Sequence, residues 1–128
     1  MISPDILLKE SKTLAVLGVN QDFDSYANKI VRKIRQIGKI AYPVNPKYAT
    51  LFNETVYASL KDLPVIPDVV VFVVNPTFGL TYLQTIKDLG IKYIWLQPGT
   101  ISQELLDKAE FMGLVAIEAC VLVVSNYL

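Results

Sequence analysis

Apolar runs alternate with amphipathic segments along this chain. Five runs predict strands, and they read TLAVLG at 13–18, KIAYPV at 39–44, DVVVFVV at 68–74, KYIWLQ at 92–97 and LVAIEA at 114–119. Runs that are apolar at nearly every position are typical of parallel strands covered on both faces. Helices are predicted at 4–11, 25–37, about 78–89 and 102–112. The segment 47–67 is weaker, with a short strand at ETVY (54–57) and a helical turn at SLKDL (59–63).

The helix predicted over 25–37 has the clearest amphipathic pattern. Its apolar stripe is expected to hold Tyr26, Ile30, Ile34 and Ile37, and Gly38 is placed to end it. Pro43 has no N–H to donate to a neighbouring strand, so the strand at 39–44 is expected at the edge of the sheet or at a bulge.

Strands that alternate with helices of about ten residues predict an α/β fold. We expect a single domain over residues 1–128, with a three-layer, Rossmann-like, doubly wound and mainly parallel sheet of five to six strands. Right-handed crossovers bring the carboxyl ends of such strands to one rim, where ligands bind at the switch point. The residues expected there are Gly18, Val19, Asn20, Asn45, Pro46, Lys47, Val74, Asn75, Pro76, Gln97, Pro98, Gly99 and Cys120.

The turn after the first strand has one glycine, whereas a dinucleotide-binding turn would carry three. Gly18 allows a sharp exit from the strand, and the helix N-terminus near Ser25 offers free N–H groups that favour a phosphate. The hydroxyls of Ser25 and Tyr26 are candidate hydrogen-bond donors to that phosphate. The alternative is that Gly18 only turns the chain and Ser25 only caps its helix.

The end of the second strand bears on the type of nucleotide. An NAD site would place an acid there to bind the ribose hydroxyls, but this sequence has Asn45, Pro46 and Lys47. A lysine suits a phosphorylated ribose, such as the 2′-phosphate of NADP or the 3′-phosphate of coenzyme A (CoA). Alternatively, these are ordinary turn residues.

Two further turns bring prolines and polar side chains to the rim. Asn75 with Pro76, and Gln97 with Pro98 and Gly99, offer flat apolar surface for an adenine or a pantetheine arm; alternatively Pro76 only begins a helix. Cys120 follows the last strand, either as a packing residue or as a thiol facing a ligand thiol, with which it would form a mixed disulfide.

Composition narrows the class of function. The absence of histidine removes the usual general base and the common zinc ligands, so no catalysis and no metal are expected. The single cysteine excludes a disulfide framework. Six of the twelve basic residues lie between residues 25 and 53, and no acidic residue lies among them. This segment would either attract a polyanion or form a solvated basic helix face.

Zero net charge argues against general nucleic-acid binding. No apolar run is long enough to span a membrane and no signal peptide precedes the first strand, so the cytoplasm is the expected location.

Six segments together resemble a known family. They are TLAVLGVN, YPVNPKY, SLKDLP, DVVVFVVNP, GIKYIWLQPG and AEFMGLVAIEAC, in this order between about residues 12 and 124. The chain resembles the small stand-alone CoA-binding proteins, relatives of the N-terminal domain of the succinyl-CoA synthetase alpha subunit. The loop VNQDFDSY departs from that family because it is compact and carries Asp22 and Asp24.

This resemblance implies a Rossmann-like domain that binds CoA. The phosphates would lie over Gly18 to Tyr26, with Lys47 near the nucleotide phosphate. Val74, Asn75 and Pro76 would flank the adenine, and Gln97, Pro98 and Gly99 would line the cleft. The synthetase reaction depends on a phosphorylated histidine in a further domain, so binding without catalysis is implied here.

Three functions remain open at this stage. The first is non-catalytic binding of CoA or an acyl-CoA, and the second is an NADP-dependent or other nucleotide-binding enzyme or sensor. The third is an interaction module without a ligand, in which the apolar tail at 121–124 would cover a partner or the second copy of a homodimer.

Overall fold

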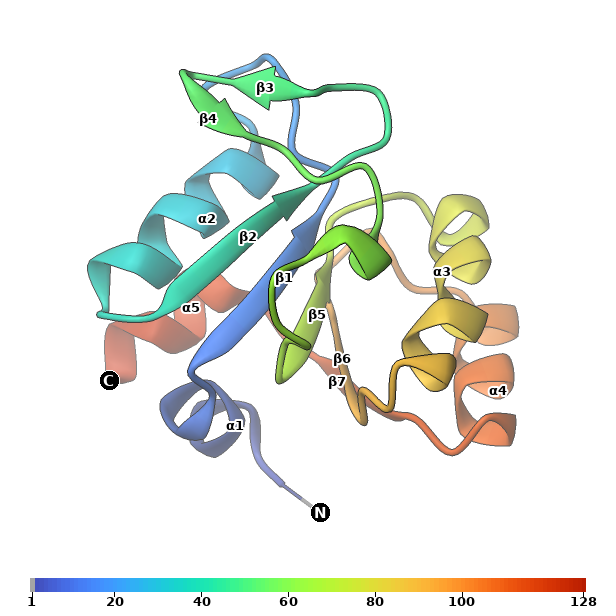
Figure 1. The fold of residues 1–128 in the computed structure, drawn as a ribbon. Helices are drawn as coiled ribbons and strands as arrows, with labels where there is room; N and C mark the ends of the chain where they lie inside the picture. The colour runs from blue at the N-terminus through green and yellow to red at the C-terminus, as the bar shows by residue number, and fades with distance from the viewer. Residues whose placement is uncertain (1) are drawn as a thin grey trace.

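The computed structural model describes residues 2–128 (Figure 1). Its main elements are α1 (Pro4–Glu10), β1 (Thr13–Leu17), α2 (Tyr26–Gln36), β2 (Ile40–Val44), β5 (Val69–Phe72), α3 (Pro76–Asp88), β6 (Tyr93–Leu96), α4 (Gln103–Phe111), β7 (Val115–Glu118) and α5 (Val121–Val124). Shorter elements are β3 (Thr50–Leu51), β4 (Glu54–Thr55) and the 3₁₀ turns η1 (Leu60–Asp62) and η2 (Ser125–Tyr127).

Five parallel strands form one sheet in the order β2-β1-β5-β6-β7. The predicted α/β Rossmann-like class is therefore confirmed, and β2 lies at the edge as Pro43 indicates. β3 and β4 pair separately as an antiparallel hairpin. The chain runs from β1 to β2 in one direction and then crosses to β5 on the other side of β1, so the switch point lies between β1 and β5.

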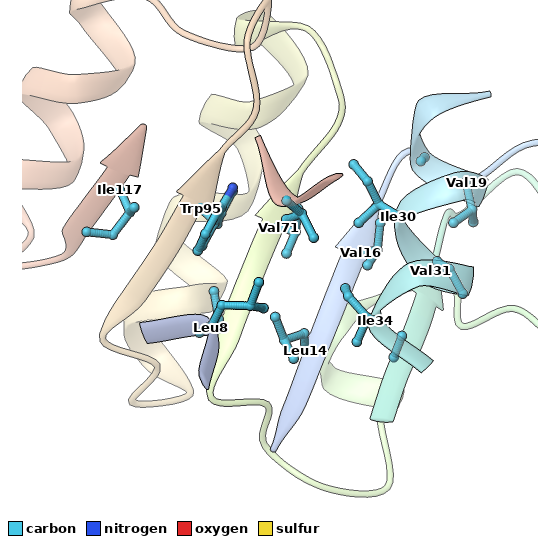
Figure 2. Packing of buried hydrophobic residues seen from close by; sticks show 14 of the residues in the cluster. Leu8, Leu14, Val16, Val19, Ile30, Val31, Ile34, Val71, Trp95 and Ile117 are labelled. Atoms are coloured by element: carbon cyan, nitrogen blue, oxygen red, sulfur yellow. The ribbon is translucent and has the colours of Figure 1, made fainter. Parts of the chain in front are cut away.

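Strand residues alternate between two cores, as the two-residue period of a strand requires. Leu14, Val16 and Trp95 point to the face covered by α1, α2 and α5, and Figure 2 shows them packing there. Leu17 and Phe72 point to the opposite face, which α3 and α4 cover. Figure 1 shows these two helical layers on either side of the sheet.

Gly18 fixes the path by which the chain leaves β1. Its φ is +100°, in the region that favours glycine, and a β-carbon there would collide with the carbonyl oxygen of Val73. The backbone beyond β5 is this close because the Val73 N–H donates to the carbonyl oxygen of Leu17 (3.2 Å). Glycine is therefore required by both conformation and space.

Two helices differ from their predicted form. Tyr26 was expected in the apolar stripe of α2, but it is 66% exposed because it stands on the first turn, at the rim; Ala27 and Val31 are buried instead. Helix α3 begins at Pro76 rather than Phe78, because the side chain of Asn75 caps it.

The apolar tail is the third difference. Residues 121–124 form α5, and Val121 is fully buried in the core shared with α1 and α2. The prediction that this segment covers a partner is wrong for Val121, since it packs against its own chain.

The hairpin also differs from expectation, since only its second strand was anticipated. The turn residues Phe52 and Asn53 have φ values of +51° and +62°. Positive φ at both central positions is the geometry of a two-residue hairpin turn, usually signalled by a glycine that this turn lacks.

Candidate functional site

A pocket of about 450 Å³ lies at the carboxyl ends of β1, β2 and β5, at the switch point. We call it the rim pocket. It is lined by Gly18, Asn20, Asn45, Pro46, Lys47, Tyr48, Val73, Val74, Asn75, Phe78 and Tyr82. Its volume falls in the range of ordinary small-molecule sites.

A smaller pocket of about 220 Å³ adjoins the rim pocket and shares Val73 with it. We call it the Cys120 pocket. It is lined by Tyr26, Val73, Gln97, Pro98 and Cys120. The two pockets together form a path that begins at the ends of β1 and β2 and continues to the ends of β6 and β7.

Most residues predicted at the rim line one of these pockets. Gly18, Asn20, Asn45, Pro46, Lys47, Val74 and Asn75 line the rim pocket, and Tyr26, Gln97, Pro98 and Cys120 line the Cys120 pocket. Four predicted residues line neither of the two, namely Val19, Ser25, Pro76 and Gly99.

Each of these four has a structural role. Val19 is 1% exposed and its side chain packs in the core (Figure 2), while its carbonyl oxygen accepts a hydrogen bond from the Asn45 side chain. The Ser25 hydroxyl accepts a hydrogen bond from the Asn28 N–H (3.3 Å) as the α2 cap. Pro76 is the first residue of α3, and Gly99, with φ +89°, turns the chain after β6.

Asn45 joins the loops after β1 and β2. Its side-chain N–H donates to the carbonyl oxygen of Val19 (2.8 Å), and its side-chain oxygen accepts from the N–H of Lys47 (2.9 Å). The same amide thus fixes the loop that would face a phosphate and the residue that carries the positive charge.

Asn28, which has no place in the predicted site, fixes the loop after Gly18 through three hydrogen bonds. Its side-chain N–H₂ donates to the carbonyl oxygens of Asn20 (2.7 Å) and Asp22 (2.6 Å), and its oxygen accepts from the Asn20 N–H (3.3 Å). The only signal for this role was a buried-face asparagine in the first turn of α2. The loop is therefore held before any ligand arrives.

Among residues 2–128, Lys47 is the one cationic side chain that lines the rim pocket. It is exposed, with Nζ 5.7 Å from the centre of the Tyr48 ring. Other basic residues of the same segment are bound within the chain: Arg35 pairs with Glu54 (2.9 Å), and Lys39 donates to the carbonyl oxygens of Lys9 and Ser11. The basic segment therefore does not present a uniform surface for a polyanion.

An aromatic wall on α3 was not predicted. Phe78 and Tyr82 stand one helical turn apart and both line the rim pocket. Burial raises the pKa of the Tyr82 phenol above its usual 10, so it is protonated at neutral pH and able to donate a hydrogen bond. The sequence signal for this wall was the spacing of four residues between Phe78 and Tyr82, in the helix that follows Asn75.

Gln97 is buried and its amide is engaged within the protein. Its oxygen accepts from the backbone N–H of Val121 (2.7 Å) and from Nε1 of Trp95 (3.1 Å), while its N–H₂ donates to Sγ of Cys120 (3.4 Å). Gln97 therefore anchors the start of α5 and positions the half-buried thiol.

Within residues 2–128, no three side chains of histidine, cysteine, aspartate or glutamate lie close enough together to hold a metal ion. Over the same residues, none of the helices has the length and apolar character to cross a membrane.

The sequence pattern of the CoA binding domain family matches residues 12–126. The chain belongs to this family. The match covers β1 to α5, and so every strand end that builds the rim pocket and the Cys120 pocket.

Solved structures of small proteins share the fold of this chain over nearly its whole length. A hypothetical protein from Pyrococcus horikoshii is similar over 100% of this chain and 96% of its own, with a TM-score of 0.88 and 26% identity. A conserved hypothetical protein from Pyrococcus furiosus is 32% identical over 88% of this chain and 97% of its own, with a TM-score of 0.80.

A larger enzyme shares the fold. The dinucleotide-forming acetyl-coenzyme A synthetase 1 of Ca. Korarchaeum cryptofilum, solved with phosphate and ADP, matches with a TM-score of 0.70 and 23% identity. The match covers 82% of this chain but 25% of the synthetase chain, so it shows a common domain fold.

Proposed function

We propose that this protein binds CoA or an acyl-CoA along the rim pocket and the Cys120 pocket, without catalysing a reaction. The observation that supports this most directly is the placement of Lys47. It lines the rim pocket at the end of β2, where the described residues include no acid to bind an unmodified ribose. Membership of the CoA binding domain family favours the same ligand.

In this proposal the nucleotide occupies the rim pocket. The adenine stacks near Phe78 and Tyr82, across from the backbone of Val74, and Lys47 binds the 3′-phosphate. The diphosphate lies over the loop after Gly18, at the N-terminus of α2, where backbone N–H groups and the helix dipole favour an anion.

The pantetheine arm then passes Val73 and enters the Cys120 pocket. The walls there include the ring of Pro98 and the side chain of Tyr26, which suit an uncharged arm. The amide of Gln97 already bonds to its own chain, so this end of the site favours apolar packing over polar recognition.

Absence of catalysis is supported by what the two pockets contain. Among residues 2–128, no carboxylate, histidine or second cationic group lines either pocket, and the thiol of Cys120 has no general base beside it in the lining. A general acid or base for acyl transfer needs such a group within hydrogen-bond reach of the reacting atom. Incubation with acetyl-CoA should therefore release no free thiol.

NADP is the second candidate, because Lys47 would serve its 2′-phosphate equally well. Thermal unfolding with CoA, dephospho-CoA, NADP and NAD separates the two. A ligand at about a hundred times its dissociation constant stabilises the fold by about 2.7 kcal/mol. Stabilisation by CoA above the other three supports the proposal, stabilisation by NADP alone replaces it, and no shift with any of them rejects both.

A further inference from the structure

A cavity of about 260 Å³ lies outside the two rim pockets, between α2 and the β3–β4 hairpin. We call it the hairpin cavity. Figure 1 shows the hairpin above the ends of β1 and β2, beside the start of α2. None of the residues that line this cavity also lines the rim pocket or the Cys120 pocket. It is therefore distinct from both pockets, and Val19 and Phe23 connect it to the loop after Gly18, over which the CoA diphosphate is proposed to lie.

The walls of the hairpin cavity are mainly aliphatic. Val19 and Val31 contribute from one side, Leu51 and Val56 from the hairpin, and Pro43 from the edge strand. Val19, Val31 and Val56 are each at least 95% buried, so they form a fixed apolar floor. The apolar surface of the cavity that is still open to solvent is therefore that of Leu51, Phe23 and Phe52, and this surface gains free energy when a hydrocarbon group covers it.

Two phenylalanines stand at the cavity. Phe23 and Phe52 meet edge to face with ring centres 5.4 Å apart, yet they are 53% and 52% exposed. The φ of +51° at Phe52 follows from its place as the first central residue of the β3–β4 turn. Two aromatic side chains that line the cavity therefore stay about half exposed to solvent.

Among the charged side chains that line the cavity, which are Arg32, Arg35 and Glu54, one cation is in excess; Asp22 and Asp24 flank Phe23 outside the lining. Arg35 is neutralised by Glu54 at 2.9 Å and also donates to the carbonyl oxygen of Ala41 (2.9 Å). Arg32 has no carboxylate partner within residues 2–128. Its guanidinium lies 3.9 Å from the centre of the Phe23 ring and donates one N–H to the Phe23 carbonyl oxygen (2.8 Å), so further donors remain for an anion.

We propose that the hairpin cavity binds a small monocarboxylate with an apolar body. The hydrocarbon part would cover Leu51 and the exposed rings of Phe23 and Phe52, and the carboxylate would pair with Arg32 in the geometry that guanidinium groups favour. This site has its own lining residues and would let the domain respond to a second small molecule.

Calorimetric titration of the wild-type protein with hexanoate, 1-hexanol and hexylamine tests the ligand class. These share one tail and differ in the charge of the head group. Hexanoate should bind about tenfold or more tightly than the alcohol, the gain expected of a charge-assisted hydrogen bond, and the amine should not bind. Equal affinity of acid and alcohol, or no binding of the acid, overturns the proposal.

Variants then locate the site. Arg32→Gln should weaken hexanoate about tenfold, whereas Lys33→Gln, a neighbouring residue outside the cavity lining, should leave it unchanged. Glu54→Gln frees the guanidinium of Arg35 and should strengthen hexanoate binding, a gain that a purely structural role of the ion pair would not produce. Equal effects of the Arg32 and Lys33 variants, or weaker binding in Glu54→Gln, contradict the assignment.

Titration of hexanoate in the presence of saturating CoA distinguishes the two sites. Unchanged hexanoate binding supports a separate cavity. Complete displacement of hexanoate by CoA would assign the cavity to the nucleotide and overturn the inference while leaving the proposed function intact.

Discussion

The side-chain amide of Asn45 donates a hydrogen bond to the carbonyl oxygen of Val19 across the gap between β2 and β1, at 2.8 Å. This bond joins the two loops that the proposal assigns to the phosphates and to Lys47. The loops belong to neighbouring parallel strands, and their relative position is set without a ligand. A site arranged in advance loses less entropy when the ligand binds.

Asn45→Ala removes both bonds of this amide, to Val19 and from the Lys47 N–H. We expect a loss of stability of about 1–2 kcal/mol and weaker CoA binding, because the loop and the lysine are no longer held together. Chemical denaturation measures the first effect and calorimetry the second. CoA affinity equal to that of the wild type would show that the link does not organise the site.

Gly18→Ala should destabilise the fold by about 3 kcal/mol or more, because it adds steric overlap with the Val73 carbonyl to an unfavourable φ. Gly38→Ala is the matched control. Gly38 has a φ of +88° with open space around it, so only conformational strain of about 1 kcal/mol applies. Denaturant midpoints of the two variants should differ clearly; similar losses would mean that the β1–β5 approach is not constrained.

Gln97→Leu should reduce stability by about 2–3 kcal/mol, since it leaves the buried Val121 N–H without an acceptor. Trp95 keeps its bond to the carbonyl oxygen of Ala119 (2.9 Å), so the loss is concentrated at the start of α5. Hydrogen exchange of the Val121 amide reports it directly. Unchanged protection of that amide would contradict the anchoring role.

Alkylation of Cys120 tests whether the pantetheine arm reaches the Cys120 pocket. The thiol is half-buried and lines that pocket, so CoA should slow its reaction with iodoacetamide. Adenosine 3′,5′-bisphosphate, which lacks the pantetheine arm, is the control and should protect much less. Equal protection by both ligands, or no protection by CoA, would contradict the placement of the pantetheine arm in this pocket.

The residues at the strand ends could be predicted from the sequence because parallel strands bring their carboxyl ends to one rim. Gly18, Asn45 and Asn75 each follow an apolar run directly, so their shared position in the rim pocket follows from topology. The hydrogen-bond partners of single side chains at the rim were harder to predict. Whether Gln97 faces a ligand or its own chain depends on Val121, which lies far along the chain and meets it only in the folded state.

The features that were missed arise from local geometry with weak sequence signals. The hairpin turn uses Phe52 and Asn53 at positive φ without a glycine, so its first strand was not anticipated. The aromatic wall of Phe78 and Tyr82 depends on where α3 begins, and helix boundaries are the least certain part of a sequence-based prediction. The hairpin cavity forms only where the unanticipated hairpin packs beside α2, so the sequence carried no separate signal for it.

Calorimetric titration of the wild type and Lys47→Ala with CoA and dephospho-CoA tests the central claim most directly, with Lys87→Ala as a control for charge outside the pocket. We expect Lys47→Ala to weaken CoA about tenfold and dephospho-CoA less than about twofold, because only CoA carries the 3′-phosphate. Lys87→Ala should change neither. Equal losses of both ligands in Lys47→Ala, or no loss of either, would contradict a site in which Lys47 reads the phosphorylated ribose.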